Sequence, residues 1–160
     1  KAIRRQRQMC IRDRTLGTYD GANIEIREQV GTDNFYLFGL REEQIQEMRA
    51  KNQYHPVDYY NNSPYIKRIM NTLNSNVFCE KDYVLLFKPI YEELLNRDYY
   101  FLLADLEAFN DTMHQIEKDY LDKDKWNKMA IKNVARIGYF SSDRAVMDYA
   151  NNIWHIKPVD

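Results

Sequence analysis

The sequence has few of the residues that mark secreted, membrane-spanning or metal-binding proteins. Its 160 residues include two cysteines, Cys10 and Cys79. One cysteine pair gives no disulfide framework, so a reducing compartment, the cytoplasm, is expected. No apolar run approaches the length of a membrane-spanning helix, and no apolar segment follows the basic N-terminus as it would in a signal peptide. We therefore expect a cytoplasmic protein that does not enter membranes.

Histidine and glycine are also scarce. His55, His114 and His155 have no partner at the spacing of metal ligands, so no metal site is expected. The five glycines form neither a phosphate-binding loop nor a dinucleotide-binding motif. No nucleophile elbow is present. The sequence therefore offers no self-contained set of catalytic residues.

Hydrophobic residues make up 44% of the chain and charged residues 29%, which is typical of a globular domain with a core. Tyrosine is abundant, with 13 copies. Exposed tyrosines can stack on sugars or on nucleic-acid bases. Most of these tyrosines fall on apolar helical stripes or beside Phe and Leu, so packing in the core is the preferred interpretation.

Positive charge is concentrated in residues 1–14, which carry six basic side chains and one acid, about +5. The whole chain is −1, so residues 15–160 sum to about −6. A nucleic-acid-binding module would spread basic side chains over its folded surface. A basic arm on a non-catalytic interaction module is one interpretation. We prefer the interpretation that residues 1–14 are a non-native tail. The domain then consists of residues 15–160, and no nucleic-acid partner is expected.

Three short segments predict strands: Thr15–Thr18, Asn34–Gly39 and Tyr99–Ala104. Asp20-Gly21 predicts a tight turn after the first strand, because glycine accepts a positive φ and aspartate bonds to its own backbone. A helix over Ala22–Val30 follows. Three strands make a thin sheet, so we expect part of a parallel α/β sheet, that is, a fragment.

The rest of the sequence predicts helices over residues 41–52, 57–62, 65–73, 83–95, 106–120, 123–137 and 142–154. Ser63-Pro64 predicts the start of the helix over 65–73, and Asp105 is the expected cap of the helix over 106–120. The expected inward stripe of that helix is Leu106, Phe109, Met113, Ile116 and Tyr120. The helix over 83–95 has two apolar stripes, so most of its surface should be covered. Two further helices have one inward stripe each. These stripes are Trp126, Met129, Ala130, Val134 and Ile137 in one helix, and Val146, Tyr149, Ala150, Ile153 and Trp154 in the other.

Several segments resemble the C-terminal end of the α-glucan phosphorylases, which act on glycogen, starch or maltodextrin. The segments stand in the family's order, from "TLGTYDGANIEIREQVG" and "NFYLFGL" through "ADLEAFNDTMHQIEKDY" to "GYFSSDR", "YANNIW" and "IKPV". The resemblance covers about residues 15–160. It implies a helix-rich part of a Rossmann-like lobe, the second lobe of a two-lobed GT-B glycosyltransferase, with few short parallel strands.

The resemblance also implies an activity for the parent protein. The family cleaves terminal α-1,4-linked glucose from an α-glucan with inorganic phosphate, releases glucose 1-phosphate and requires pyridoxal phosphate. It is usually homodimeric. Its cofactor lysine closes a Gly-Thr-Gly-Asn-Met-Lys motif eight residues before the position of Thr15, where this sequence has Arg7. A guanidinium cannot form the Schiff base that a lysine forms, so the chain alone is expected to be inactive.

No principal catalytic or cofactor-contacting residue of the family falls on this chain. The resemblance implies a supporting role instead. The strand and the turn that begin at Thr15 directly follow the family's cofactor-lysine segment and are expected to hold that segment in place. The residues expected to supply this support are Gly17, Thr18, Asp20, Gly21 and Asn23. The last helix is expected to need the absent first lobe, so that part of its stripe, Trp154 above all, stays exposed in this chain.

Overall fold

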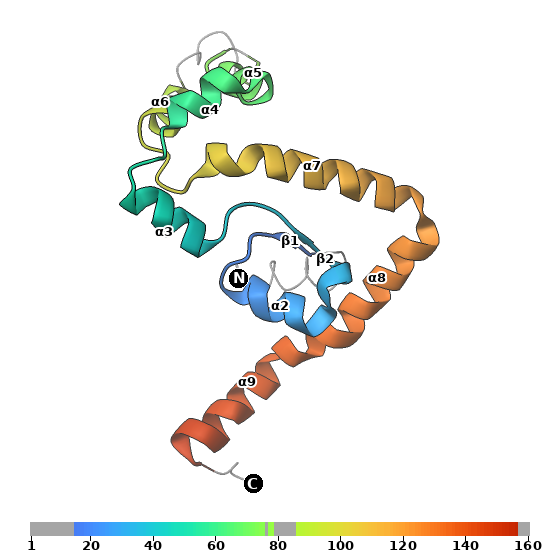
Figure 1. Cartoon of the computed structure of the whole chain (residues 1–160). Coiled ribbons are helices and arrows are strands. Elements are labelled where there is room, and N and C mark those ends of the chain that lie inside the picture. Colours follow the sequence, from blue (N-terminus) through green and yellow to red (C-terminus); the bar gives the residue numbers. More distant parts are fainter. Residues whose placement is uncertain (1–14, 76, 79–85, 157–160) are drawn as a thin grey trace. The chain divides into compact units, whose positions relative to one another are not determined.

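A computed structural model describes residues 15–75, 77–78 and 86–156 as a helix-rich α/β arrangement (Figure 1). Its elements are β1 (Thr15–Gly17), α2 (Ala22–Val30), η1 (Thr32–Asn34), β2 (Phe35–Leu37), α3 (Glu42–Ala50), α4 (Pro56–Asn62), α5 (Pro64–Leu73), α6 (Lys88–Asn96), α7 (Leu102–Leu121), α8 (Lys123–Arg136), η3 (Ile137–Phe140), α9 (Ser142–Tyr149) and the π-helical η4 (Ala150–Trp154). Within the described residues, no helix combines the length and apolarity needed to cross a bilayer.

The described residues form two compact units. The first contains residues 15–17, 21–36 and 118–156, and the second contains residues 18–20 and 37–117. In the first unit, β1 and β2 pair in a two-stranded parallel sheet joined through α2. Ile26 and Val30 of α2, Phe35 of β2 and Met129 of α8 are buried there. The first unit is therefore a β-α-β segment completed by a helix from the far end of the sequence.

The second unit has its core between helices. Ile66 and Met70 of α5 and Leu103 of α7 are almost fully buried, and half-buried tyrosines and leucines of α4, α5, α6 and α7 pack against them. The predicted start of α5 is confirmed, because the Ser63 Oγ accepts a hydrogen bond of 3.2 Å from the Ile66 amide and Pro64 occupies the first turn.

Of the three predicted strands, the first two are confirmed in shortened form and the third, Tyr99–Ala104, is wrong. α7 begins at Leu102, earlier than predicted, and the carboxylate that accepts from its first amides is that of Asp98, four residues before the helix, rather than that of Asp105. The Asp98 carboxylate accepts from the amides of Leu102 at 2.9 Å and Leu103 at 2.7 Å. An acceptor at this position favours a helix start over a strand, and that signal outweighs the β propensity of the aromatic residues.

The expectation that the helix over 83–95 is covered on most of its surface is also wrong. Residues 79–85 lie outside the described residues, and the helix, α6, covers Lys88–Asn96. Tyr91, Leu94 and Leu95 pack against the core of the second unit. Ile90 is exposed. Both predicted stripes, Leu86-Ile90-Leu94 and Phe87-Tyr91-Leu95, thus contribute contacts to the core, but Leu86 and Ile90 stay exposed.

On α8 the predicted inward stripe is right at Met129 and wrong at Val134. Met129 is buried, and Trp126, Ala130 and Ile137 are half-buried. Val134 is 50% exposed, whereas its neighbour Asn133 is 0% exposed. The buried face is rotated by one position because Asn133 makes hydrogen bonds inside the unit that valine cannot make.

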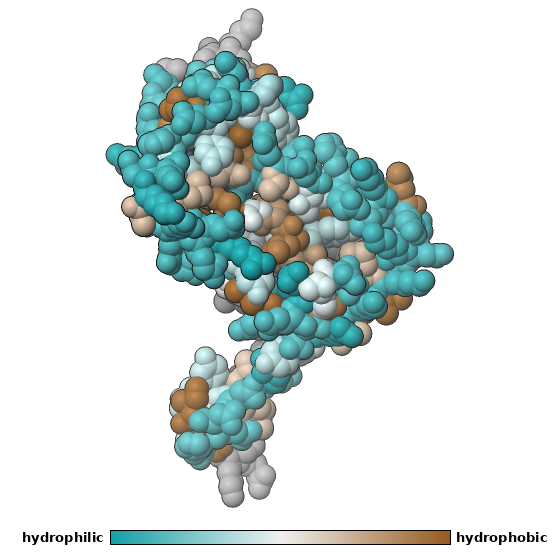
Figure 2. Space-filling view, viewed as in Figure 1, coloured by the Kyte–Doolittle hydropathy of each residue, from teal (hydrophilic) through white to brown (hydrophobic). Residues whose placement is uncertain are grey.

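The last helical segment confirms the predicted exposure of its stripe. α9 begins at a Ser141 cap, whose Oγ accepts from the Arg144 amide at 3.2 Å, and η4 continues it. Trp154 is 58% exposed. Val146, Tyr149 and Ile153 are also exposed, and hydrophobic side chains appear on the surface of this segment (Figure 2).

Candidate functional site: the turn between β1 and α2

The turn that follows β1 is the site to which the sequence assigned a supporting role. The predicted turn at Asp20-Gly21 and the helix over Ala22–Val30 are both confirmed. The Asp20 amide donates to the Thr18 carbonyl at 2.9 Å, and the Ile24 amide donates to the Gly21 carbonyl at 3.2 Å. These two local hydrogen bonds turn the chain from the strand into the helix.

Gly17 and Asn23 are brought together by this turn. A Cβ added at Gly17 would lie 2.6 Å from Asn23 Nδ2 and 3.0 Å from Asn23 Cγ. Gly17 is buried at the end of β1, and Asn23 is half-buried in the first turn of α2. Glycine is therefore required at position 17 to admit the asparagine side chain against the strand backbone.

Gly21 is required for a different reason. It caps α2 with φ 50° and ψ −134°, in the left-handed half of backbone space that L-residues rarely enter. Nothing lies within 4 Å of a Cβ built there, so the constraint is conformational rather than steric. Asp20 and Gly21 are exposed, and they shape the turn without being buried by it.

Thr18 and Asp20 group with the second unit, unlike Gly17, Gly21 and Asn23. In that unit the Arg41 guanidinium lies over the ring of Tyr19, 4.9 Å from its centroid. A cation over an aromatic face is attracted by the ring quadrupole. Three of the five predicted residues thus belong to the first unit and two to the second.

The C-terminal end of α2 is held by side chains that sequence reasoning did not select. The Val30 carbonyl accepts from Asn34 Nδ2 at 2.8 Å and from Arg136 Nη1 at 3.4 Å. Arg136 Nη1 also lies 3.3 Å from the Gln29 carbonyl. The last carbonyls of a helix have no intrahelical partner, and a cation there also interacts favourably with the helix dipole. Arg136 in α8 therefore anchors the helix that follows the turn.

Asn133 links α8 to the last residue of η1, directly before β2. Its Nδ2 donates to the Asn34 carbonyl at 3.0 Å and to the Met129 carbonyl at 3.1 Å. Most buried polar groups are hydrogen-bonded, and here the Nδ2 of Asn133 is bonded whereas its Oδ1 is buried without a partner among the described residues. The sequence signal that could have found Asn133 is its place one turn after Met129, on the buried face of α8.

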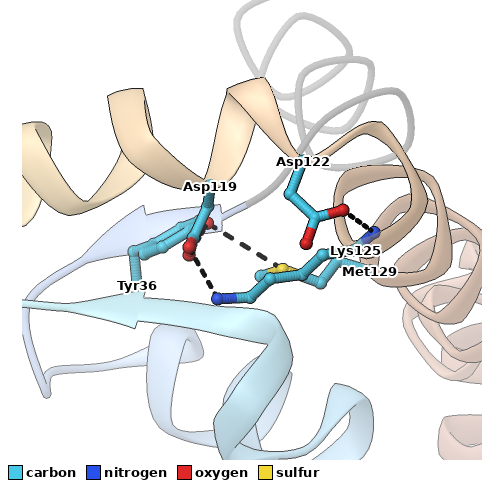
Figure 3. A network of polar contacts seen from close by, with 5 residues as sticks. All are labelled: Tyr36, Asp119, Asp122, Lys125 and Met129. Carbon is cyan, nitrogen blue, oxygen red and sulfur yellow. Dashed lines mark hydrogen bonds and ion pairs between the residues drawn. The ribbon is translucent and has the colours of Figure 1, made fainter.

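A second buried network joins β2 to the end of α7 and to α8 (Figure 3). The Tyr36 Oη donates to Asp119 Oδ2 at 2.8 Å and lies 3.8 Å from Met129 Sδ. Lys125 Nζ pairs with the other carboxylate oxygen of Asp119 at 2.6 Å. Asp122 caps α8 by accepting from the Lys125 amide at 3.0 Å. Asp119 is buried although the predicted stripe of this helix placed Tyr120 inward; Tyr120 is exposed.

The arrangement of this turn supports a structural role and not a chemical one. No lysine lies between Thr15 and Val30, so the turn contains no amine that could bind an aldehyde cofactor covalently. Three cavities of the second unit are lined by residues of α3, α5, α6 and the loop before α7, and the turn residues line none of these three. In the part of the chain that the structure describes, no group of three or more metal-ligating side chains gathers. Arg7 and the basic residues 1–14 lie outside the described residues.

Comparison with known proteins gives the context of this turn. The family model of the carbohydrate phosphorylases matches residues 12–156. The chain is 47% identical over 145 residues to the glycogen phosphorylase of Synechocystis sp. and 40% identical over 147 residues to that of Bacillus subtilis. It is 36% identical over 146 residues to the human brain-form glycogen phosphorylase.

These alignments cover 91% of the chain but 17% to 18% of each relative. The chain thus spans about a sixth of the length of the curated relatives it matches.

Proposed function

Because the chain belongs to the carbohydrate phosphorylase family, we propose that it forms part of an α-1,4-glucan phosphorylase. The parent enzyme would transfer the terminal glucose of an α-glucan to inorganic phosphate and release glucose 1-phosphate. The observation that carries this proposal is the 47% identity over 145 residues to a protein named glycogen phosphorylase. Residues 15–160 belong to the C-terminal part of the second, Rossmann-like lobe, and residues 1–14 are a non-native tail.

The role that we assign to this segment is support of the cofactor-bearing lobe. Gly17 admits Asn23 against the end of β1, and Gly21 sets the backbone that starts α2. Arg136 and Asn34 hold the far end of α2 through the Val30 carbonyl. A site must be held to within about 0.5 Å by the residues around it. In the parent enzyme, the segment that precedes the position of Thr15 would thus be held in place by β1. The end of β1 packs against Asn23, and the helix that follows, α2, is anchored at its C-terminal end.

Pyridoxal phosphate is the cofactor proposed for the parent enzyme, where its phosphate group would supply proton transfer to the attacking phosphate. The turn does not fit its covalent attachment, because residues 15–30 include no lysine. We therefore assign no chemical step to this chain. The parent enzyme is proposed to be a cytoplasmic homodimer, with α-glucan and inorganic phosphate as its substrates.

The isolated chain is expected to be inactive. The purified 160-residue protein, incubated with glycogen, inorganic phosphate and pyridoxal phosphate, should release no glucose 1-phosphate above a protein-free control. Measurable release in a coupled assay would refute the proposal that catalysis needs the rest of the enzyme.

A chimaera tests the family function directly. Residues 15–160 replace the matching C-terminal segment of the Synechocystis glycogen phosphorylase, which is 47% identical. The chimaera should bind pyridoxal phosphate and release glucose 1-phosphate from maltoheptaose. A folded chimaera that holds the cofactor stoichiometrically but shows no phosphorolysis would contradict the proposal.

A matched pair of variants in the same chimaera tests the supporting role. Gly17→Val places a side chain where Asn23 lies, whereas Gly138→Val meets nothing within 4 Å of its Cβ. Gly17→Val should lower the bound cofactor, measured by its absorbance, together with the rate. Equal cofactor content and equal rates in the two variants would exclude a role for the turn.

A further inference from the structure

The loop between α6 and α7 carries two non-glycine residues with positive φ, Asp98 at 35° and Phe101 at 59°. Such conformations are unfavourable for residues with a side chain and persist only where the surroundings hold them. The Asp98 carboxylate caps α7 and accepts a hydrogen bond from the Tyr54 hydroxyl. The Phe101 ring stacks on Tyr54 with centroids 4.1 Å apart. The loop is therefore held at both ends in a strained conformation.

In this conformation the loop exposes two tyrosine side chains to solvent. Tyr99 is 65% exposed and Tyr100 is 75% exposed, whereas the next residue, Phe101, is 3% exposed. The two tyrosine rings lie edge to face with centroids 5.1 Å apart. The expectation that the tyrosines pack in the core is thus wrong for this pair.

Arg49 of α3 fixes Tyr99 in place. Its Nη2 donates to the Tyr99 carbonyl at 2.6 Å, and its guanidinium lies 4.8 Å from the centroid of the Tyr99 ring. A ring that is fixed before binding loses little conformational freedom when a ligand arrives. The tyrosine pair is therefore a pre-organised aromatic surface.

Tyr99 lines two hollows in the surface of the second unit. One is an apolar groove of about 300 Å³, lined also by Tyr100, Ile90, Leu94 and Leu102. The other is a more polar cavity of about 210 Å³, lined also by Arg49, Asn52 and Arg97. Ligand sites combine apolar walls with a few polar groups that fix orientation. The two hollows share Asp98 and Tyr99 in their walls.

The ligand chemistry that fits this combination is a neutral carbohydrate chain. A glucose ring presents C–H bonds on its faces, and these suit the negative face of an aromatic ring. Its hydroxyls at the ring edge suit amide and guanidinium groups such as those of Asn52 and Arg97. The Asp98 carboxylate is already engaged in the cap, and Arg49 already contacts Tyr99, so the site does not present a free cluster of charge for an anion.

We propose that the Tyr99–Tyr100 surface is an accessory binding site for linear α-1,4-glucan. This inference rests on the proposed function, since it takes its ligand from the substrate class of the parent enzyme. The site binds the polymer away from the reacting bond and performs no chemical step. Tyr100 stacks on one glucose unit, and Tyr99 contacts the next where the two hollows meet.

The test is a direct binding measurement on the 160-residue chain, by calorimetry with maltoheptaose and with the β-1,4-linked cellohexaose. Maltoheptaose should bind, and cellohexaose should bind at least about tenfold more weakly. Tyr100→Ala should weaken maltoheptaose binding by about tenfold, the loss typical of one stacking residue. Tyr139→Ala, which removes another exposed tyrosine, should leave the affinity within about twofold.

Far-UV circular dichroism confirms that each variant is folded, and Tyr100→Ser replaces Tyr100→Ala if the alanine variant is not. Absence of maltoheptaose binding by the folded chain, equal binding of cellohexaose, or an equal effect of Tyr139→Ala would overturn the proposal. Self-association of the chain that Tyr100→Ala abolishes, without sugar binding, would assign the surface to a protein contact instead. An active chimaera with no binding by the chain would leave the proposed function intact and remove only this inference.

Discussion

The Tyr36 hydroxyl donates a hydrogen bond of 2.8 Å to the Asp119 carboxylate across 83 positions of sequence. This bond ties the second strand of the sheet to the end of α7, and Lys125 balances the charge of the same carboxylate. Because both side chains are buried, removing one partner leaves the other without its hydrogen bond and lowers the free energy of unfolding.

Tyr36→Phe should lower the free energy of unfolding by about 1–3 kcal/mol, the usual worth of a hydrogen bond to a charged group. Urea denaturation followed by circular dichroism measures the change. Tyr120→Phe is the matched control, because Tyr120 is an exposed tyrosine in the same helix as Asp119. Equal stability of the Tyr36→Phe variant and the parent chain would show that the bond contributes nothing.

Gly17→Ala should destabilise the chain by about 1–2 kcal/mol, in the range of an overpacked site. The added methyl group would stand 2.6 Å from Asn23 Nδ2, so one of the two must move. Gly138→Ala has no such neighbour and should be close to neutral. Combining Gly17→Ala with Asn23→Ala should cost less than the sum of the two single changes; strict additivity would show that the two residues do not compete for space.

Asp105→Asn should alter how stability depends on pH. Burial raises the pKa of the Asp105 carboxyl, the nearby Asp98 raises it further, and the hydrogen bond from the Leu40 amide partly opposes the rise. A carboxyl with a raised pKa in the folded state ionises first in the unfolded state, so its ionisation favours unfolding as the pH rises. The stability of Asp105→Asn relative to the parent should therefore increase between about pH 3 and pH 7.

Asp105→Ala separates the charge from the hydrogen bond, since alanine offers no acceptor to the Leu40 amide. This variant should lose stability at every pH relative to Asp105→Asn. A stability difference between Asp105→Asn and the parent that stays flat with pH would refute the raised pKa.

Trp154→Ala should change the stability of the isolated chain by less than about 0.5 kcal/mol, as for an exposed position. It should also reduce self-association, measured by analytical ultracentrifugation, because it removes apolar surface from α9 and η4. The rival arrangement packs this stripe on the helix over 123–137. Under that arrangement the loss would be several kcal/mol, as for a core tryptophan.

Local signals predicted the parts of this structure that depend on neighbouring residues. Ser63-Pro64 identified the start of α5, and Asp20-Gly21 identified the turn. Both work through bonds or dihedral angles within a few residues. The Tyr99–Ala104 segment failed because its aromatic residues favour a strand, whereas Asp98, just outside the segment, supplies the cap that starts α7.

The residues that anchor the candidate site could not be found in this way. Asn133 and Arg136 act on carbonyls about a hundred positions earlier in the sequence. The spacing of apolar residues in α8 predicted that Val134 is buried rather than Asn133. A hydrophobic pattern cannot identify a buried amide whose Nδ2 makes two hydrogen bonds. Only the packing of α8 on α2 and η1 gives these polar residues their role.

The same long-range contacts set the order in which this chain can fold as it is synthesised. The Arg136 side chain reaches a carbonyl 107 positions earlier, and Asn133 reaches one 99 positions earlier. Residues 37–117, which make up nearly all of the second unit, are translated between residues 21–36 and the segment of the first unit that begins at Lys118. Closing loops of that length carries an entropic cost and slows folding. On the ribosome, β1, α2 and β2 must wait with their apolar faces open until α8 emerges, so the second unit is free to fold first.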